Sequence, residues 1–364
     1  MNIPFNTLKP LYEAHGAEYR EAAVRVLDSG WYVLGKETGA FEEEFAAFAG
    51  SSYCVGLNSG LDALSLALRA LGTGPGDEVI VPANTYIATA LAVTANGAVP
   101  VFVDSDEYHC IDAGRIEEAV TSKTRCILPV HLYGQACDMG AVMRAAEKHG
   151  LFVAEDCAQS HGAAWEGKLS GTFGNIGCFS FFPTKNIGAF GDAGAVVTDD
   201  AALADKVRML RNYGSRKKYY NEIPGVNSRL DEIQAALLRV RLKHADEILE
   251  TRKRIAETYL RLLRNERIAL PRVRAGASHT WHLFAIECGR RDELQLFLRE
   301  NGIETQIHYP VPPYLSDVYS HMNLTRTSFP TASLQADRVL SLPLYHGMSE
   351  EDINHVAETV NRFR

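Results

Sequence analysis

One lysine in this chain is placed where its amine could do chemistry. Lys185 lies between a strand-like apolar run over residues 178–182 and a glycine-rich loop over residues 188–194. A lysine side chain is costly to bury and mobile when exposed, so packing alone seldom explains such a position. An amine held in a pocket can instead form an imine with an aldehyde or ketone. We therefore predict that Lys185 is catalytic, and an ordinary loop lysine is the alternative.

A carboxylate follows a second apolar run. Asp156 comes two residues after the end of residues 151–154, which we expect to form a strand, although an aspartate there could simply cap a turn. An imine-forming amine and an anion facing a pyridine nitrogen are what pyridoxal phosphate requires, so the pair predicts that cofactor. Gln159 could hydrogen-bond the phenolic oxygen of the same ring. His161 could orient this loop, or it could be a core histidine.

The phosphate of such a cofactor needs hydrogen-bond donors. Ser59 and Gly60 open a predicted helix over residues 61–71 directly after a strand, and free amides at a helix N-terminus favour an anion. Ser59 would equally serve as a plain N-cap. Ser180 would supply a second hydroxyl. Tyr86 follows the next strand, where its ring could stack on the pyridine face or pack half-buried.

Other polar residues are candidates for substrate contact. Lys217 belongs to the basic run over residues 216–218, which could face an anionic substrate or form a solvated surface. His308 and Tyr309 form a candidate substrate edge, with an ordinary loop as the alternative. Asn227 is by type a good cap for the long helix that follows it.

The elements that must position these residues alternate between strand and helix. Continuous apolar strands predict a largely parallel sheet covered on both faces, with ligands at the carboxyl ends of its strands. A long helical pattern over residues 228–263 leads to a smaller domain with further strands at residues 282–287 and 303–307. We predict an α/β protein with a large domain over residues 1–245 and a small C-terminal domain over residues 246–364. In the large domain, the strands are predicted at residues 53–57, 78–81, 99–103, 126–130 and 151–154.

Composition excludes several other classes of protein. The chain has 364 residues, of which 46% are hydrophobic, so it can bury a substantial core. A formal net charge of -8 argues against generic binding to nucleic acid or membrane surfaces. No signal peptide and no membrane-length apolar run is recognisable, and seven cysteines without a CxxC pair indicate free thiols in the cytoplasm. No metal-ligand spacing, GxGxxG fingerprint, Walker loop or GxSxG elbow is present, so no metal is predicted.

The motifs, taken in order along nearly the whole chain, resemble those of the DegT/DnrJ/EryC1/StrS sugar aminotransferases, within fold type I of the pyridoxal-phosphate enzymes. The matching segments are residues 30–35, 58–60, 82–86, 130–135, 155–159, 180–192 and 227–232.

The resemblance implies a role for each matching residue. Lys185 would carry the cofactor, Asp156 would face its pyridine nitrogen and Gln159 would lie by its phenolic oxygen. The phosphate would be surrounded by Ser59, Gly60, Leu61 and Ser180. Leu61 stands where many members have threonine, which removes a side-chain donor but keeps the backbone amide. Asn227 would reach the cofactor phosphate of the other subunit, which implies a homodimer with shared active sites.

The variant motifs resemble the subgroup that aminates carbon 3 of dTDP-3-keto-6-deoxyhexoses. Tyr32, within the motif of residues 30–35, is included among the expected substrate contacts. Lys185, rather than the histidine of some relatives, favours transamination over dehydration.

The expected reaction moves an amino group, from glutamate, to such a sugar. The alternatives are amination at carbon 4, a UDP-linked 3-keto sugar, or a regulator that binds the cofactor without turnover. The configuration at carbon 4 stays open, as does the product's destination in an O-antigen, an S-layer glycan or a secondary metabolite.

Overall fold

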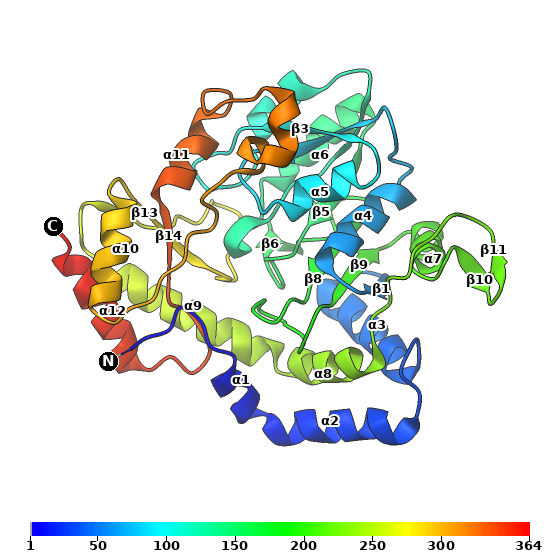
Figure 1. Ribbon diagram of the computed structural model, residues 1–364, viewed down its shortest axis with the longest axis horizontal. Coiled ribbons are helices and arrows are strands. Elements are labelled where there is room, and N and C mark those ends of the chain that lie inside the picture. Colours follow the sequence, from blue (N-terminus) through cyan, green and yellow to red (C-terminus); the bar gives the residue numbers. More distant parts are fainter. Residues whose placement is uncertain (1) are drawn as a thin grey trace.

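A seven-stranded sheet forms the centre of the computed structural model, which describes residues 2–364 (Figure 1). The strand order is β1-β9-β8-β5-β4-β2-β3. Among these seven strands, β9 runs antiparallel to both its neighbours and the other pairs are parallel. The sheet is therefore largely parallel, as predicted, and it is mixed because β9 is reversed. Its strands are β1 (Tyr53–Leu57), β2 (Glu78–Pro82), β3 (Val99–Val103), β4 (Thr124–Ile127), β5 (Phe152–Asp156), β8 (Ile176–Ser180) and β9 (Gly194–Thr198).

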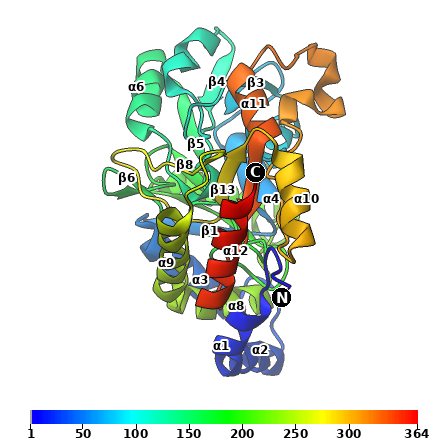
Figure 2. The ribbon, with the colours of Figure 1, turned by 90° about the vertical axis from the view of Figure 1, so that its left-hand side faces the viewer.

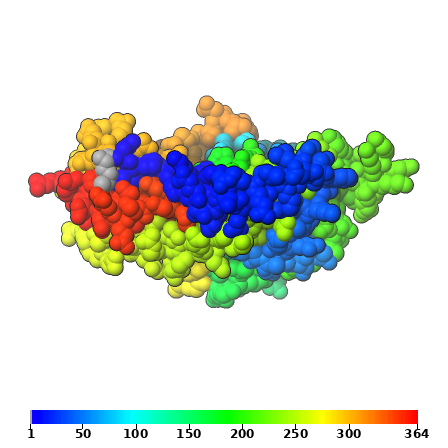
Figure 3. Space-filling view, turned by 90° about the horizontal axis from the view of Figure 1, so that it is seen from below, coloured from blue at the N-terminus to red at the C-terminus, as the bar shows by residue number. Residues whose placement is uncertain are grey.

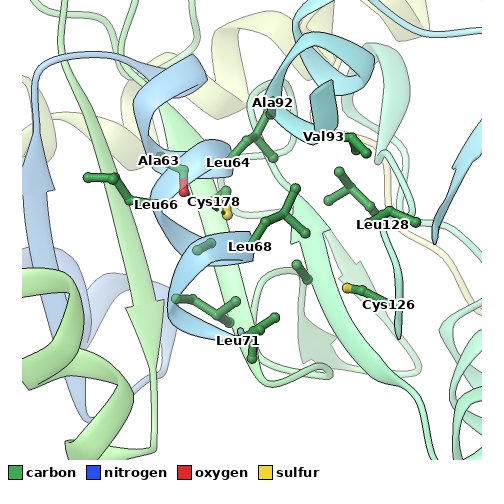
Figure 4. Packing of buried hydrophobic residues seen from close by; sticks show 14 of the residues in the cluster. Ala63, Leu64, Leu66, Leu68, Leu71, Ala92, Val93, Cys126, Leu128 and Cys178 are labelled. Atoms are coloured by element: carbon green, nitrogen blue, oxygen red, sulfur yellow. Dashed lines mark hydrogen bonds between the residues drawn. The ribbon is translucent and has the colours of Figure 1, made fainter. Parts of the chain in front are cut away.

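Helices cover both faces of this sheet. Successive strand residues point to opposite faces, so Val79 and Val81 pack against one helical layer while Ile80 packs against the other. Burial on both faces explains why these strands read as continuous apolar runs. One layer holds α4 (Gly60–Ala70), α5 (Ala88–Thr94) and α7 (Ala201–Leu210), and its core is shown in Figure 4. The other layer holds α3 (Lys36–Ala49), α6 (Met139–His149) and α8 (Glu232–Lys243), with α1 (Lys9–Ala14) and α2 (Gly16–Ser29) outside α8.

A smaller antiparallel sheet organises the C-terminal part of the chain (Figure 2). Its strands are β12 (Ile268–Ala269), β13 (Phe284–Cys288) and β14 (Val339–Leu342), and the surrounding helices are α9 (Ala245–Leu262), α10 (Arg291–Glu300) and α12 (Glu350–Arg362). The N-terminal segment joins this core, because Ile3 is buried there and pairs with Ile303. Conversely, Tyr314 and Tyr319 are buried in the large-domain core, as is Ala332 of α11 (Pro330–Arg338).

The buried side chain of Arg252, in α9, stabilises the region around this small sheet. Its buried guanidinium donates hydrogen bonds to the backbone carbonyls of Trp281, His282 and Leu344. Burial lowers the pKa of Arg252 to about 10. The cation therefore stabilises the loops on both sides of the small sheet by satisfying carbonyls that water does not reach.

The remaining elements are short. Two hairpins are formed by β6 (Ala164–Trp165) with β7 (Lys168–Leu169) and by β10 (Ser215–Lys217) with β11 (Tyr220–Asn221). The 3-10 turns are η1 (Ala113–Ala119), η2 (Leu132–Gly134), η3 (Pro313–Leu315) and η4 (Asp317–Met322).

Three local predictions were wrong. The helical pattern over residues 228–263 is two helices, because the backbone leaves helical geometry at His244 with φ -104° and ψ 16°. Asn227 does not cap α8, whose N-cap is Asp231. Asn227 instead forms an isolated antiparallel β-bridge with Asn212. Residues 303–307 form two isolated bridges rather than a strand, since they contact the N-terminal segment at one end and β14 at the other.

Within residues 2–364, none of the helices combines the length and the apolar character that crossing a membrane demands. All seven cysteines are buried and unpaired.

Candidate active site

A cavity of about 910 Å³ opens at the carboxyl ends of the parallel strands. This volume suits a cofactor together with part of a substrate. Asp156 ends β5, Lys185 follows β8 and Tyr86 follows β2, so the sheet brings the three to one wall. The small domain closes the opposite side with residues that include His308 and Tyr309.

Lys185 sits on a tight turn just beyond β8. Its backbone N–H donates to the carbonyl of Phe182 at 2.8 Å, and the side chain lines the cavity. Burial lowers the pKa of Lys185 to about 8, while the Asp156 carboxylate opposes this change by stabilising the ammonium. An amine with this pKa can hold or release a proton near neutral pH, as imine chemistry requires.

Asp156 is held by a chain of hydroxyl groups. The Thr89 hydroxyl donates to Asp156 Oδ2 at 2.8 Å, and the Ala158 N–H donates to Oδ1 at 3.1 Å. Since the Thr89 proton is committed to the carboxylate, the Thr85 hydroxyl 2.8 Å away must donate to Thr89. Burial raises the pKa of Asp156, and these hydrogen bonds oppose that rise. The arrangement keeps a negative charge available at the base of the cavity.

Gln159 is held by hydrogen bonds to two tyrosines. Its Oε1 accepts from the backbone N–H of Tyr133 at 2.6 Å, and its Nε2 donates to the Tyr309 hydroxyl at 3.0 Å. The Tyr309 ring lies 5.2 Å from the ring of Tyr86. Gln159, Tyr86 and Tyr309 all line the cavity.

The N-terminus of α4 forms one end of the cavity. Ser59 caps the helix by accepting from the Asp62 N–H at 3.1 Å, and Leu61 and Ser180 lie beside it. Gly60 packs so tightly that a Cβ there would lie 2.5 Å from Cβ of Ser180. Any side chain at this position would therefore separate α4 from β8, which explains the glycine.

Three neutral histidines surround the lysine. Burial and the nearby Lys185 charge lower the pKa of His161 to about 3 and that of His308 to about 4, and they hold the pKa of His282 well below its usual value. His282 and His308 line the cavity. His161 is a core residue that packs against Phe179, and neither ring nitrogen has a partner among the described residues.

Three predicted residues lie outside the cavity of their own chain. Asn227 is exposed, and the Tyr32 hydroxyl donates to the carbonyl of Leu27 at 3.3 Å. Lys217 lies on the hairpin β10–β11, which projects from the large domain, with its amine 5.0 Å from the ring centre of Tyr220 (Figure 1). The other ten predicted site residues line the cavity: Asp156, Lys185, Ser59, Gly60, Leu61, Tyr86, Gln159, Ser180, His308 and Tyr309.

Sequence reasoning missed Thr85, Thr89 and His282. The two threonines are four residues apart, with Thr85 in the loop after β2 and Thr89 in the first turn of α5. This spacing beside Tyr86 was the available signal. Nothing in the sequence near His282 distinguishes it from a packing residue.

The residues fit pyridoxal phosphate. Lys185 offers an amine, Asp156 offers an anion, and the amides of Gly60 and Leu61 at the start of α4 offer an anion site. Ser59 and Ser180 add hydroxyls at the same end. Amine, anion and phosphate donors thus occupy one cavity.

Known proteins with this architecture share much of the sequence. The sequence profile of the DegT/DnrJ/EryC1/StrS aminotransferase family matches residues 13–361. The dTDP-3-amino-3,6-dideoxy-alpha-D-galactopyranose transaminase of Aneurinibacillus thermoaerophilus is 48% identical over 362 residues, which are 99% of each chain.

Solved structures agree over the same length. The crystal structure of S. venezuelae DesV has a TM-score of 0.97 and 49% identity, and the match covers 99% of this chain and 98% of that one. NtdA from Bacillus subtilis, crystallised with its cofactor PMP, has a TM-score of 0.91 and 32% identity, with coverage of 99% and 84%.

Proposed function

Because this chain belongs to the DegT/DnrJ/EryC1/StrS aminotransferase family, we propose that it aminates carbon 3 of a nucleotide-linked ketosugar. The acceptor is a dTDP-3-keto-6-deoxyhexose, the amino donor is L-glutamate and the product is a dTDP-3-amino-3,6-dideoxyhexose. The observation that carries the proposal is the Lys185 amine facing the buried Asp156 in one cavity with a phosphate site. The carbon position and the nucleotide are supported by the A. thermoaerophilus relative.

Each group in the cavity has a distinct task. When bound, pyridoxal phosphate supplies an aldehyde for the amine and a ring that accepts electrons. Lys185 Nζ would hold the cofactor and would take up or release a proton, for which a pKa of about 8 is suitable. Asp156 would face the ring nitrogen, and its charge would keep that nitrogen protonated. The amides of Gly60 and Leu61 would bind the phosphate, and the Tyr309 side of the cavity would help to exclude water.

We further propose a homodimer with shared active sites. Large apolar side chains are exposed on α2 and on the segment after it, including Leu27 at 61% and Trp31 at 64%. Such a cluster on one side of a single chain supports an interface with another copy. Asn227 and Lys217 lie outside their own cavity, which suits contacts with the phosphate and the substrate of the partner subunit. A cytoplasmic location is supported by the seven unpaired thiols.

The reaction is tested by following the absorbance of the bound cofactor. Glutamate should convert the aldehyde form to the amine form, and dTDP-3-keto-6-deoxyglucose should restore the original spectrum. A shift with glutamate that only a 4-keto sugar or a UDP-linked 3-keto sugar reverses would keep the enzyme class and reject the substrate. A chromophore that never responds to glutamate would instead indicate a regulator.

The shared site is tested with mixed dimers. Lys185→Ala and Asn227→Ala chains should each be inactive as homodimers. If each cavity uses Asn227 of the partner, one site of a mixed dimer is intact and activity returns. Complementation that fails although the mixed dimer forms would place Asn227 in the cavity of its own chain.

A further inference from the structure

Three histidines at the ends of helices or in a loop lie close together, outside the candidate active site. His15 separates α1 from α2, and His244 separates α8 from α9. His346 lies in the loop between β14 and α12. Seen from below, the blue N-terminal helices, the yellow-green α9 and the red C-terminal segment adjoin one another (Figure 3). This junction therefore joins helices packed on the large domain to the small domain.

The three imidazoles converge on a single carboxylate. His15 Nε2 lies 3.3 Å from Oε2 of Glu247, and His244 Nδ1 lies 4.0 Å from the same oxygen. His346 Nε2 lies 3.7 Å from the other oxygen, Oε1. The histidine side chains are largely buried, with 12%, 18% and 14% of their surface exposed, whereas that of Glu247 is 48% exposed.

The His244 nitrogen that faces this carboxylate has a lone pair to give when the imidazole is neutral. His244 Nε2 is 3.0 Å from Oε1 of Glu18, so the Nε2–H donates there and Nδ1 keeps its lone pair toward Glu247. A carboxylate that fixes the far nitrogen of a histidine is a recurrent feature of metal sites. His15 Nε2 makes no hydrogen bond of good geometry among the described residues, although it is buried. Burial lowers the pKa of His346, which favours the neutral imidazole as a ligand.

We propose that His15, His244 and Glu247, joined by His346, bind one divalent transition-metal ion of the Zn²⁺ type. Three imidazoles and one carboxylate form a donor set that Zn²⁺ accepts. Bonds of about 2.0–2.2 Å place neighbouring donors of a tetrahedral site about 3.3–3.5 Å apart. The ligand atoms of His15, His244 and Glu247 lie within 4.8 Å of one another and thus require small movements, whereas His346, whose Nε2 is 3.7 Å from the carboxylate, would have to move closer to the other two imidazoles.

Ion entry requires one rearrangement. The rings of His15 and His244 stack with their centres 3.5 Å apart and their planes within 9°. A shared ion must lie near both ring planes, so one ring has to tilt about its Cβ–Cγ bond, a torsion with broad minima. Glu247 can follow because its side chain is half-exposed.

The bound ion would add a link between segments that are now held by packing and by side-chain contacts such as the His244–Glu18 hydrogen bond. It would link the start of α2, the start of α9 and the loop before α12. Since these ligands converge only in the folded chain, binding would stabilise the native state and oppose movement between the domains at the α8–α9 break.

The test uses the holoenzyme, stripped of metal with a chelator and titrated with Zn²⁺ against a chromophoric competitor. We expect one Zn²⁺ per chain. Glu247→Gln and His15→Gln should each weaken binding at least about tenfold, and Glu18→Gln by about 10–100-fold through the lost orientation of His244. His321→Gln is the matched control, because this histidine is exposed on η4 and should leave the affinity unchanged.

The Glu247→Gln variant also separates a loss of metal binding from a loss of folding. Its half-exposed side chain can be changed with little loss of packing, and circular dichroism should match the wild type. No stoichiometric binding by the wild type, or equal affinity in the wild type, Glu247→Gln and His15→Gln, would overturn the proposal.

Discussion

The hydroxyl chain beneath the cavity makes a quantitative prediction. Thr89→Val preserves the shape of the side chain but removes the 2.8 Å hydrogen bond to the Asp156 carboxylate. A hydrogen bond to a charged group contributes about 1.5–3 kcal/mol, so the ionised carboxylate should lose stabilisation of that size. The variant also leaves the buried Thr85 hydroxyl without its 2.8 Å partner.

The sign of the pH dependence follows from the same contact. Burial already raises the pKa of Asp156 above its unfolded value, and loss of the Thr89 donor should raise it further. A carboxyl group with a raised folded-state pKa destabilises the fold as pH rises through the interval between its unfolded and folded pKa values. The variant should therefore be less stable than the wild type at pH 7. The difference in stability should shrink in acid, where Asp156 is protonated in both proteins.

The assay is urea unfolding of the cofactor-free protein at several pH values, paired with cofactor affinity by fluorescence quenching. Thr89→Ser should restore both, because the hydroxyl returns. Thr85→Val should cost only about 0.5–1.5 kcal/mol, since it removes a neutral hydrogen bond. A Thr89→Val protein whose stability at pH 7 and affinity match the wild type would refute the hydroxyl chain as a support of the charge.

Three further outcomes are expected. The rate of cofactor capture by the cofactor-free protein should rise with pH through about 8, because only the neutral Lys185 amine reacts; stopped-flow absorbance that shows no pH dependence would contradict this. Gly194→Ala should weaken cofactor binding in equilibrium dialysis, because the added Cβ would overlap the Ser59 carbonyl. The control Gly191→Ala, whose Cβ meets only a flexible side chain, should change the cofactor affinity little. Arg252→Met should destabilise the protein by at least about 2 kcal/mol in urea unfolding, since buried carbonyls lose their donor; an unchanged midpoint would argue that water replaces it.

Position along the chain was enough to predict that Lys185 and Asp156 line the same cavity. Lys185 and Asp156 each follow an apolar strand, and parallel strands deliver whatever follows them to one edge. Two features did not follow from pattern. The reversed direction of β9 is invisible because strands buried on both faces read alike in either direction. The break at His244 is invisible because the apolar pattern of α8 continues into α9.

Residues that act through distant partners were the least predictable. Thr89 matters only because α5 lies beside the end of β5, and that contact depends on tertiary packing. Asn227 was assigned to a site by resemblance and Lys217 by the basic run around it, yet the cavity of their own chain lies elsewhere. The role of such a residue depends on contacts with residues distant in sequence or in another copy of the chain.

The placement of Ile3 has a consequence for synthesis on the ribosome. Ile3 pairs with Ile303 and is buried with residues as late as Phe363. At about 5–20 residues per second, Ile3 waits roughly 15–60 s for a partner 300 residues away. The large-domain sheet has all its strands by residue 198, long before that partner is made. The nascent chain must therefore carry an apolar N-terminal end unburied beside a largely translated first domain, and the last helix must leave the ribosome before the second core can close.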